Sequence, residues 1–182
     1  MNPLNEALLL LAVSTPTGLM LKLADSLGEK GNSLESFTVA GGAAAGFWLL
    51  LKSSTAGSTL GLAIILGSLA ALKVDRLNLW FGLAITAVLA VILGWIPPSI
   101  PALIPLVALT AADEYLHEYG RKLTGALRKL SASRPLLKTG VAMLAVASLL
   151  SPAAIPAILA FDLAYEAAGR LMGEASRIPR KL

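Results

Sequence analysis

The residues best able to do chemistry are acidic and basic side chains that recur at the ends of apolar segments. DEYLHEYGRKL at 113–123 and DLAYEAAGRLM at 162–172 share an aspartate, an acid or histidine four residues later, and then Gly-Arg. DSLGEKG at 25–31 repeats the spacing of the first two positions. Residues four apart share one face of a helix, so each segment presents two side chains together. The pairs are Asp25 with Glu29, Asp113 with His117, and Asp162 with Glu166.

These pairs have ligand types that suit a divalent cation. Carboxylate oxygens with one imidazole are typical ligands of Mg²⁺, Mn²⁺ or Zn²⁺. Two acids four residues apart repel, and carboxylates at helix C-termini are disfavoured, so we expect a metal, a neighbouring base or a shared proton to compensate. We therefore predict a metal site at these six residues, with Mg²⁺ or another divalent cation as cofactor. Arg121, Lys122 and Arg170 are the candidates for binding a phosphate or a lipid headgroup.

Two other interpretations of the charged segments remain open. Residues 111–131 have the pattern of an amphipathic helix, with Leu116, Tyr119 and Leu123 broadly on one side and charges on the other. Such a helix would lie at a membrane surface, with its bases on anionic headgroups of the cytoplasmic side. On this interpretation the repeat is only the way a span ends. The third interpretation places a cation site at the mouth of a pore.

The composition indicates a membrane protein. The chain has 182 residues, of which 56% are hydrophobic and 14% charged, with a mean hydropathy of +0.75. Soluble domains have about 25% charged residues. Because the deficit extends over the whole chain, we predict an all-α, polytopic protein of the cell membrane, with one transmembrane domain over residues 1–182. The basic excess is typical of membrane-flanking loops, so no nucleic-acid partner is expected.

Apolar runs bounded by polar, proline or glycine residues predict about seven short spans. They cover residues 4–24, 36–51, 56–72, 77–96, 99–116, 136–151 and 153–172. In an alternative arrangement the last two form a re-entrant hairpin, which leaves five full spans. A short basic tail follows at 173–182.

The distribution of lysine and arginine predicts the orientation of these spans. With alternating spans, fourteen of the fifteen bases fall on one side, and only Lys52 falls on the other. Basic residues are enriched in cytoplasmic loops, so the N-terminus is predicted outside and the C-terminus inside. No base precedes Lys22, which is typical of a retained first helix rather than a cleaved signal peptide.

Small residues predict how the helices pack. Gly42 and Gly46, and likewise Gly57 and Gly61, have the GxxxG spacing that lets helices approach closely. This contact lies either within the chain or between copies in a homo-oligomer. The chain has no cysteine and no glutamine, and this depletion of heat-labile residues is typical of a thermophilic prokaryote.

Three functions are consistent with the sequence, and whether the protein is an enzyme remains open. No Walker A, GxGxxG, HExxH or GxSxG motif is present. We favour a small passive transporter or channel for an ion or small solute with a charged cytoplasmic mouth, because little chain lies outside the spans. We expect no span to have a charged residue near its middle, and this disfavours an ion-coupled carrier. The alternatives are a metal-dependent lipid-phosphate or prenyl-phosphate enzyme at the cytoplasmic face, and a non-catalytic subunit of a membrane complex.

Overall fold

The described part of the chain is entirely helical. The computed structural model describes residues 2–31, 33–120 and 134–175, which form seven α-helices and no strand. The helices are α1 (Pro3–Glu29), α2 (Leu34–Ser53), α3 (Thr55–Ala70), α4 (Leu77–Leu93), α5 (Ile100–Gly120), α7 (Pro135–Val146) and α8 (Ala154–Ala175). The prediction of an all-α fold is confirmed, and one helix occurs in each predicted segment. The predicted amphipathic helix at 111–131 overlaps α5, but its residues 121–131 lie outside the described part, as do 176–182 of the basic tail.

Local sequence signals explain where several helices begin. The Asn2 side chain accepts a hydrogen bond from the Leu4 amide at the start of α1. Ser33 and Ser54 similarly accept hydrogen bonds from amides in the first turns of α2 and α3. Short polar side chains favour this position because they pair amides that lack a partner within the helix. The residue before α7 is Arg134, whose side chain makes no such bond, so α7 needs its cap from elsewhere.

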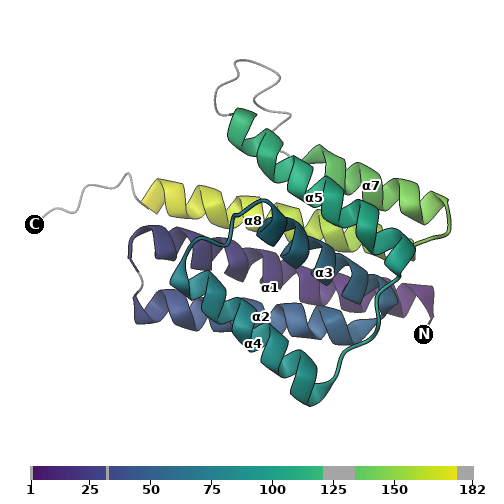
Figure 1. Ribbon diagram of the computed structural model, residues 1–182, viewed down its shortest axis with the longest axis horizontal. Coiled ribbons are helices and arrows are strands. Elements are labelled where there is room, and N and C mark those ends of the chain that lie inside the picture. The colour runs from purple at the N-terminus through teal and green to yellow at the C-terminus, as the bar shows by residue number, and fades with distance from the viewer. Residues whose placement is uncertain (1, 32, 121–133, 176–182) are drawn as a thin grey trace, which may run out of the picture.

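Successive helices run in opposite directions along the bundle, so every second connection lies at the same end (Figure 1). The α1–α2 and α3–α4 connections, the end of α5, the beginning of α7 and the end of α8 lie at one end, here called the inner end. The beginning of α1 and the α2–α3, α4–α5 and α7–α8 connections lie at the other, outer end. Hydrogen bonds join these outer connections, for example from the Ser99 hydroxyl to the Leu149 carbonyl at 3.3 Å.

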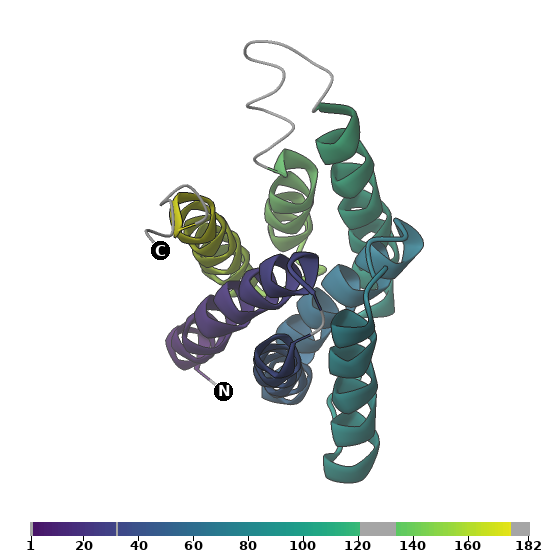
Figure 2. The ribbon, with the colours of Figure 1, turned by 90° about the vertical axis from the view of Figure 1, so that its left-hand side faces the viewer.

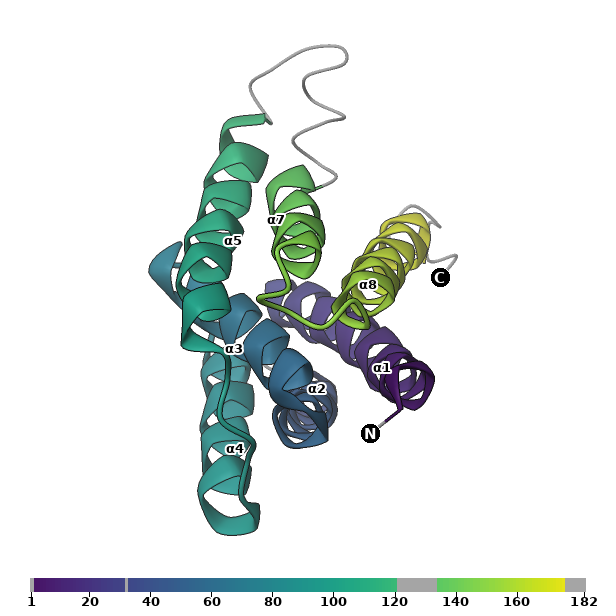
Figure 3. The same cartoon turned by 90° about the vertical axis from the view of Figure 1, so that its right-hand side faces the viewer.

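Six helices form a closed ring of neighbours. Around it, α1 packs against α2, α2 against α3, α3 against α5, α5 against α7, α7 against α8, and α8 against α1. The remaining helix, α4, packs chiefly against α2 and stands at one edge of the bundle (Figures 2 and 3). A buried hydrogen bond of 2.7 Å from Asn78 Nδ2 to the Ala24 carbonyl also joins α4 to α1. The ring defines an interior that several helices share.

Glycines stand where the helices approach closely. A Cβ atom at Gly46 would overlap the Thr17 side chain of α1, and one at Gly42 would lie 2.7 Å from Met20 Sδ. Gly57 and Gly61 likewise face side chains of α1 and α2. All four glycines of the GxxxG pairs therefore make contacts within the chain, which supports the intramolecular interpretation. A homo-oligomer through these glycines stays a prediction.

Many large apolar side chains remain exposed. The outer half of α4 is the clearest case: Val91 is 84% exposed and Ile92 is 72% exposed. By length and composition, two described helices, Pro3–Glu29 and Leu34–Ser53, are able to cross a membrane. Thr55–Ala70, Leu77–Leu93 and Pro135–Val146 are apolar but shorter. A signal sequence or a soluble core helix can meet the same criterion, so the polytopic arrangement, its orientation and its re-entrant alternative stay predictions.

Candidate functional site: two cavities separated by an apolar barrier

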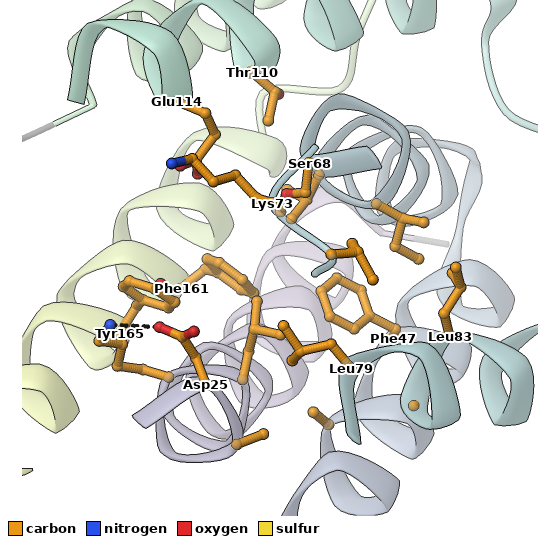
Figure 4. Close-up of a pocket in the computed structure, with 18 of the residues that line it drawn as sticks. Asp25, Phe47, Ser68, Lys73, Leu79, Leu83, Thr110, Glu114, Phe161 and Tyr165 are labelled. Atoms are coloured by element: carbon orange, nitrogen blue, oxygen red, sulfur yellow. Dashed lines mark hydrogen bonds and ion pairs between the residues drawn. The ribbon is translucent and has the colours of Figure 1, made fainter. Parts of the chain in front are cut away.

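A cavity of about 350 Å³ opens among the helices at the inner end. All seven described helices and the α3–α4 connection contribute to its lining. Figure 4 shows Asp25 and Tyr165 on one side of this inner cavity and Glu114 and Lys73 on another. Aliphatic and aromatic side chains, among them Phe47 and Leu83, form the rest of the wall. The inner cavity thus combines a charged rim with an apolar wall.

The inner cavity brings together most of the residues that the repeat singled out. Asp25, Glu29, Asp113, His117 and Asp162 all line it, although they come from α1, α5 and α8. Glu166 is absent from the lining; it accepts a hydrogen bond of 3.1 Å from Arg170, one helical turn away. Arg121 and Lys122, the other candidates for a phosphate or headgroup contact, lie outside the described residues.

Basic side chains pair with the carboxylates that α1 contributes. Lys22 Nζ lies 2.7 Å from Asp25 Oδ2, and Arg76 Nη1 lies 3.3 Å from Asp25 Oδ1. Arg76 also approaches Glu29, at 3.5 Å. The arginine lies in the α3–α4 connection, so these contacts tie that connection to the end of α1. The repulsion expected between Asp25 and Glu29 is therefore offset by a shared guanidinium group.

A second charged cluster joins α5, α7 and α8. Arg134 lies 2.7 Å from Glu114, and Lys138 pairs with Asp162. Burial lowers the pKa of the Arg134 guanidinium, but Tyr165, Glu114 and Asp162 raise it, and the resulting pKa lies above its ordinary value. The Arg134 guanidinium carbon also lies 4.6 Å from the centre of the Tyr165 ring. This cluster therefore keeps its arginine charged and attaches α7 to both neighbours.

Asp113 has a different partner, the N-terminus of α7. Its two carboxylate oxygens accept hydrogen bonds from the Leu136 amide at 3.1 Å and the Leu137 amide at 2.7 Å. These are amides that a helix leaves unpaired in its first turn. Asp113 thus supplies from α5 the cap that Arg134 does not provide.

These contacts bear on the predicted metal site. In the described ranges, no group of three or more histidine, aspartate or glutamate side chains is arranged to hold a metal ion. Neighbouring bases and backbone amides already compensate the charge of Asp25, Asp113 and Asp162. The donor set therefore does not fit a divalent ion in this conformation, and the metal site stays a prediction.

Sequence reasoning missed the bases of this site and misplaced one acid. Lys22, Arg134 and Lys138 were assigned to membrane-flanking charge, whereas each lines the inner cavity. The three-residue spacing of Lys22 and Asp25 was an available signal, since it places both on one face of α1. The expectation that no span has charge near its middle was wrong for α8, because Asp162 lies well inside Ala154–Ala175.

A second cavity, also of about 350 Å³, lies at the outer end. Its polar lining consists of one carboxylate, Glu6, and the hydroxyls of Thr55, Ser99, Ser148 and Ser151. Glu6 Oε2 accepts a hydrogen bond of 2.8 Å from the Ser151 hydroxyl, which joins α1 to the α7–α8 connection. The sequence repeat does not include any of these residues.

An apolar barrier separates the two cavities. Three helices, α1, α3 and α7, reach both cavities, and α5 and α8 reach the inner one and begin one and two residues after Ser99 and Pro152 of the outer lining. Buried side chains of the main hydrophobic cluster occupy these helices between the two linings: Leu10, Leu60, Leu106, Val141, Ala154 and Ala157. Along α3, the outer lining ends at Ala56 and the inner one begins at Ile64, which corresponds to about 12 Å of helix.

Comparison of the chain with protein-family models, with curated proteins and with solved structures finds no match in any of the three.

Proposed function

We propose that the chain is an integral membrane protein that passes an ion or small solute along the interior of its helix ring. One observation carries this proposal: a cavity lies at each end of α1, α3 and α7, and a cluster of buried apolar side chains lies between the two linings. A protein that binds a ligand only at its cytoplasmic face has no need of the outer cavity. The charged rim of the inner cavity is then the cytoplasmic mouth.

The exposed apolar surface supports the membrane setting. Soluble monomers rarely expose large contiguous apolar patches. Here such side chains continue along one helix from Trp80 and Phe81 to Val91 and Ile92. Threonine hydroxyls within the helices bond to carbonyls one turn earlier, as Thr110 does to Leu106 at 2.8 Å. These bonds satisfy polar groups where no water is present. The lipid bilayer is therefore the proposed partner of these surfaces, in a cell membrane.

The helix count supports seven crossings rather than five. The twelve residues of α7 extend about 18 Å, less than the about 30 Å of a hydrocarbon core. Nevertheless Lys138 of α7 lines the inner cavity and Ala145 the outer one, so α7 connects the two ends. A re-entrant hairpin would instead turn back before it reaches the outer end. We therefore propose seven crossings, with the N-terminus outside and the C-terminus inside.

The barrier is the proposed control point. Leu106 and Val141 are fully buried there, within the hydrophobic cluster between the two linings. Moving an ion through such a region without polar contacts is costly, so passage requires the barrier to open or hydrate. Shortening a barrier side chain should therefore increase leakage.

Flux through reconstituted vesicles tests the proposal. Vesicles with the purified protein should swell in a glycerol gradient faster than empty vesicles, and Leu106→Ala should swell faster still, by roughly two- to tenfold, because it leaves a void in the barrier. Val91→Ala is the matched control, since this side chain is exposed on α4 far from the lining residues. Both variants should be compared at equal incorporation. Glycerol and potassium chloride fluxes at the level of empty vesicles, in wild type and Leu106→Ala alike, would refute the transport function.

One observation favours the enzyme alternative. Asp25, Asp113 and Asp162 reach a single cavity, as a metal-dependent lipid-phosphate or prenyl-phosphate enzyme would require. Their existing pairing with bases and amides speaks against it, because a metal would have to displace those partners. Magnesium-dependent release of phosphate from a prenyl diphosphate, abolished in Asp162→Asn, would favour the enzyme over the transporter.

A further inference from the structure

The formal charges around the two cavities have the opposite sign from the chain as a whole. The chain has a net charge of +4. The lining of the inner cavity nevertheless has six carboxylates, from Asp25, Glu29, Asp75, Asp113, Glu114 and Asp162, against five bases, from Lys22, Lys73, Arg76, Arg134 and Lys138. The excess of basic over acidic residues in the protein therefore does not come from the residues that line the proposed path.

The lining of the outer cavity has charge of one sign only. Glu6 is the only charged residue in its lining, and the remaining polar groups are hydroxyls. The one base predicted on this side, Lys52, is absent from the lining. Its ammonium group instead donates to the Leu93 carbonyl at 3.1 Å and lies 5.1 Å from the centre of a Trp48 ring. No described base thus neutralises the outer cavity from within its lining.

This arrangement has the chemistry of a cation-attracting vestibule. A carboxylate near low-dielectric walls produces a local negative potential that concentrates cations and repels anions. Hydroxyl oxygens can replace part of the hydration shell of a cation and can also bind neutral hydroxyl compounds. Glu6 lies in the first turn of α1, where the helix dipole favours negative charge. Acidic side chains at pore mouths commonly select cations in this way.

We propose that the path admits small cations and neutral hydroxyl solutes and excludes anions, with Glu6 as the selective group at the outer cavity. This inference rests on the proposed transport function and names the solute class for it. Ser151 positions Glu6 through its hydrogen bond and contributes no charge of its own.

The experiment uses the full-length protein in vesicles with a potassium chloride gradient and a voltage-sensitive dye. Wild type should develop the potential set by K⁺, and Glu6→Gln should lower the permeability of K⁺ relative to Cl⁻ by about fivefold, the factor expected for a unit charge about 4 Å from an ion in water. Glu6→Lys should reverse the preference. Glu35→Gln is the control, because Glu35 is also in the first turn of a helix but lies outside both linings.

Glycerol swelling of the same vesicles separates the two proposals. Thermal unfolding of the purified Glu6→Gln protein, compared with wild type and Glu35→Gln, shows independently of transport whether the variant is folded. Glycerol flux with equal or greater permeability to Cl⁻ in wild type would overturn the inference and leave transport standing, even if Glu6→Gln does not fold. An unchanged K⁺ preference in a folded Glu6→Gln protein would also overturn it. If wild type passes neither glycerol nor potassium chloride, both proposals fall.

Discussion

Single glycines set the distance between helices in this molecule. Gly46 meets Thr17 where α2 crosses α1, and Gly82 similarly faces the Ala40 carbonyl where α4 crosses α2. A helix pair that lacks hydrophobic attraction in lipid gains most from such close contact. By contrast, Gly41 has open space around it, with Ile85 Cδ1 at 3.9 Å as the only atom that a Cβ would meet. Neighbouring glycines of one helix therefore have different roles.

Gly46→Ala should destabilise the protein, whereas Gly41→Ala should leave it unchanged or slightly more stable. The added methyl at position 46 forces α1 and α2 apart, at a cost of about 1–3 kcal/mol. At position 41 it has room, and alanine favours the helical state by up to about 1 kcal/mol over glycine. Equilibrium unfolding in mixed detergent micelles measures both free energies. Equal effects of the two substitutions would contradict the intramolecular role of Gly46.

At the scale of elements, α7 depends on its neighbours for its position. It is the shortest described helix, it follows an arginine in the left-handed region at φ 45°, and its cap comes from α5. Arg134 and Lys138 pair with carboxylates of α5 and α8 respectively. These contacts all lie at the inner end, so they position α7 beside the mouth of the inner cavity.

Asp113→Ala should therefore destabilise the α5–α7 contact. Removing the carboxylate leaves the Leu136 and Leu137 amides without their partner, at a cost of about 1–3 kcal/mol. Asp113→Asn should be intermediate, since its one carbonyl oxygen still accepts a hydrogen bond. The control is Asp75→Ala, whose side chain is 63% exposed. Hydrogen exchange of the first turn of α7 measures the effect, and equal protection in Asp113→Ala and wild type would show that the cap is unimportant.

At the scale of the whole molecule, the ring of six helices gives each end its own chemistry. Charged side chains gather around the inner cavity, whereas hydroxyls and one carboxylate line the outer cavity. Alternating helix directions produce this separation, because every second connection returns to the same end (Figure 1). A membrane protein with this pattern is expected to keep its basic end in the cytoplasm.

Labelling of single cysteines tests this orientation, and the natural absence of cysteine leaves no background. Pro97→Cys, in the α4–α5 connection at the outer end, should react with a membrane-impermeant maleimide on intact cells. Glu35→Cys, at the inner end, should react only after the cells are permeabilised. Both native side chains are exposed, so accessibility within the protein does not distinguish them. The reverse labelling pattern would invert the proposed topology, and labelling of both in intact cells would exclude it.

The sequence by itself determined the helices. Apolar runs and their polar, proline and glycine boundaries depend on neighbouring residues, so a helix occurs in each predicted segment. The largest discrepancies are at α7, which ends at Val146 although the predicted span continues to 151, and at α1, which continues to Glu29 although the predicted span ends at 24. The four-residue spacing of the acids also placed each pair on one helix face, which is again a local property.

Only the tertiary structure decided what those faces meet. The convergence of Asp25, Asp113 and Asp162 on one cavity depends on α1 packing against α8 and on α5 packing against α3 and α7, and Gly18, Gly67 and Gly140 permit close approach at these contacts. The same packing delivers Arg134 to Glu114 and Lys138 to Asp162, pairings that no local spacing contains, whereas Lys22 pairs with Asp25 three residues along α1. Glu6 and Ser151, 145 positions apart, meet for the same reason. Helix formation is a short-range property of the chain, whereas a cavity is made by side chains that only long-range packing brings together.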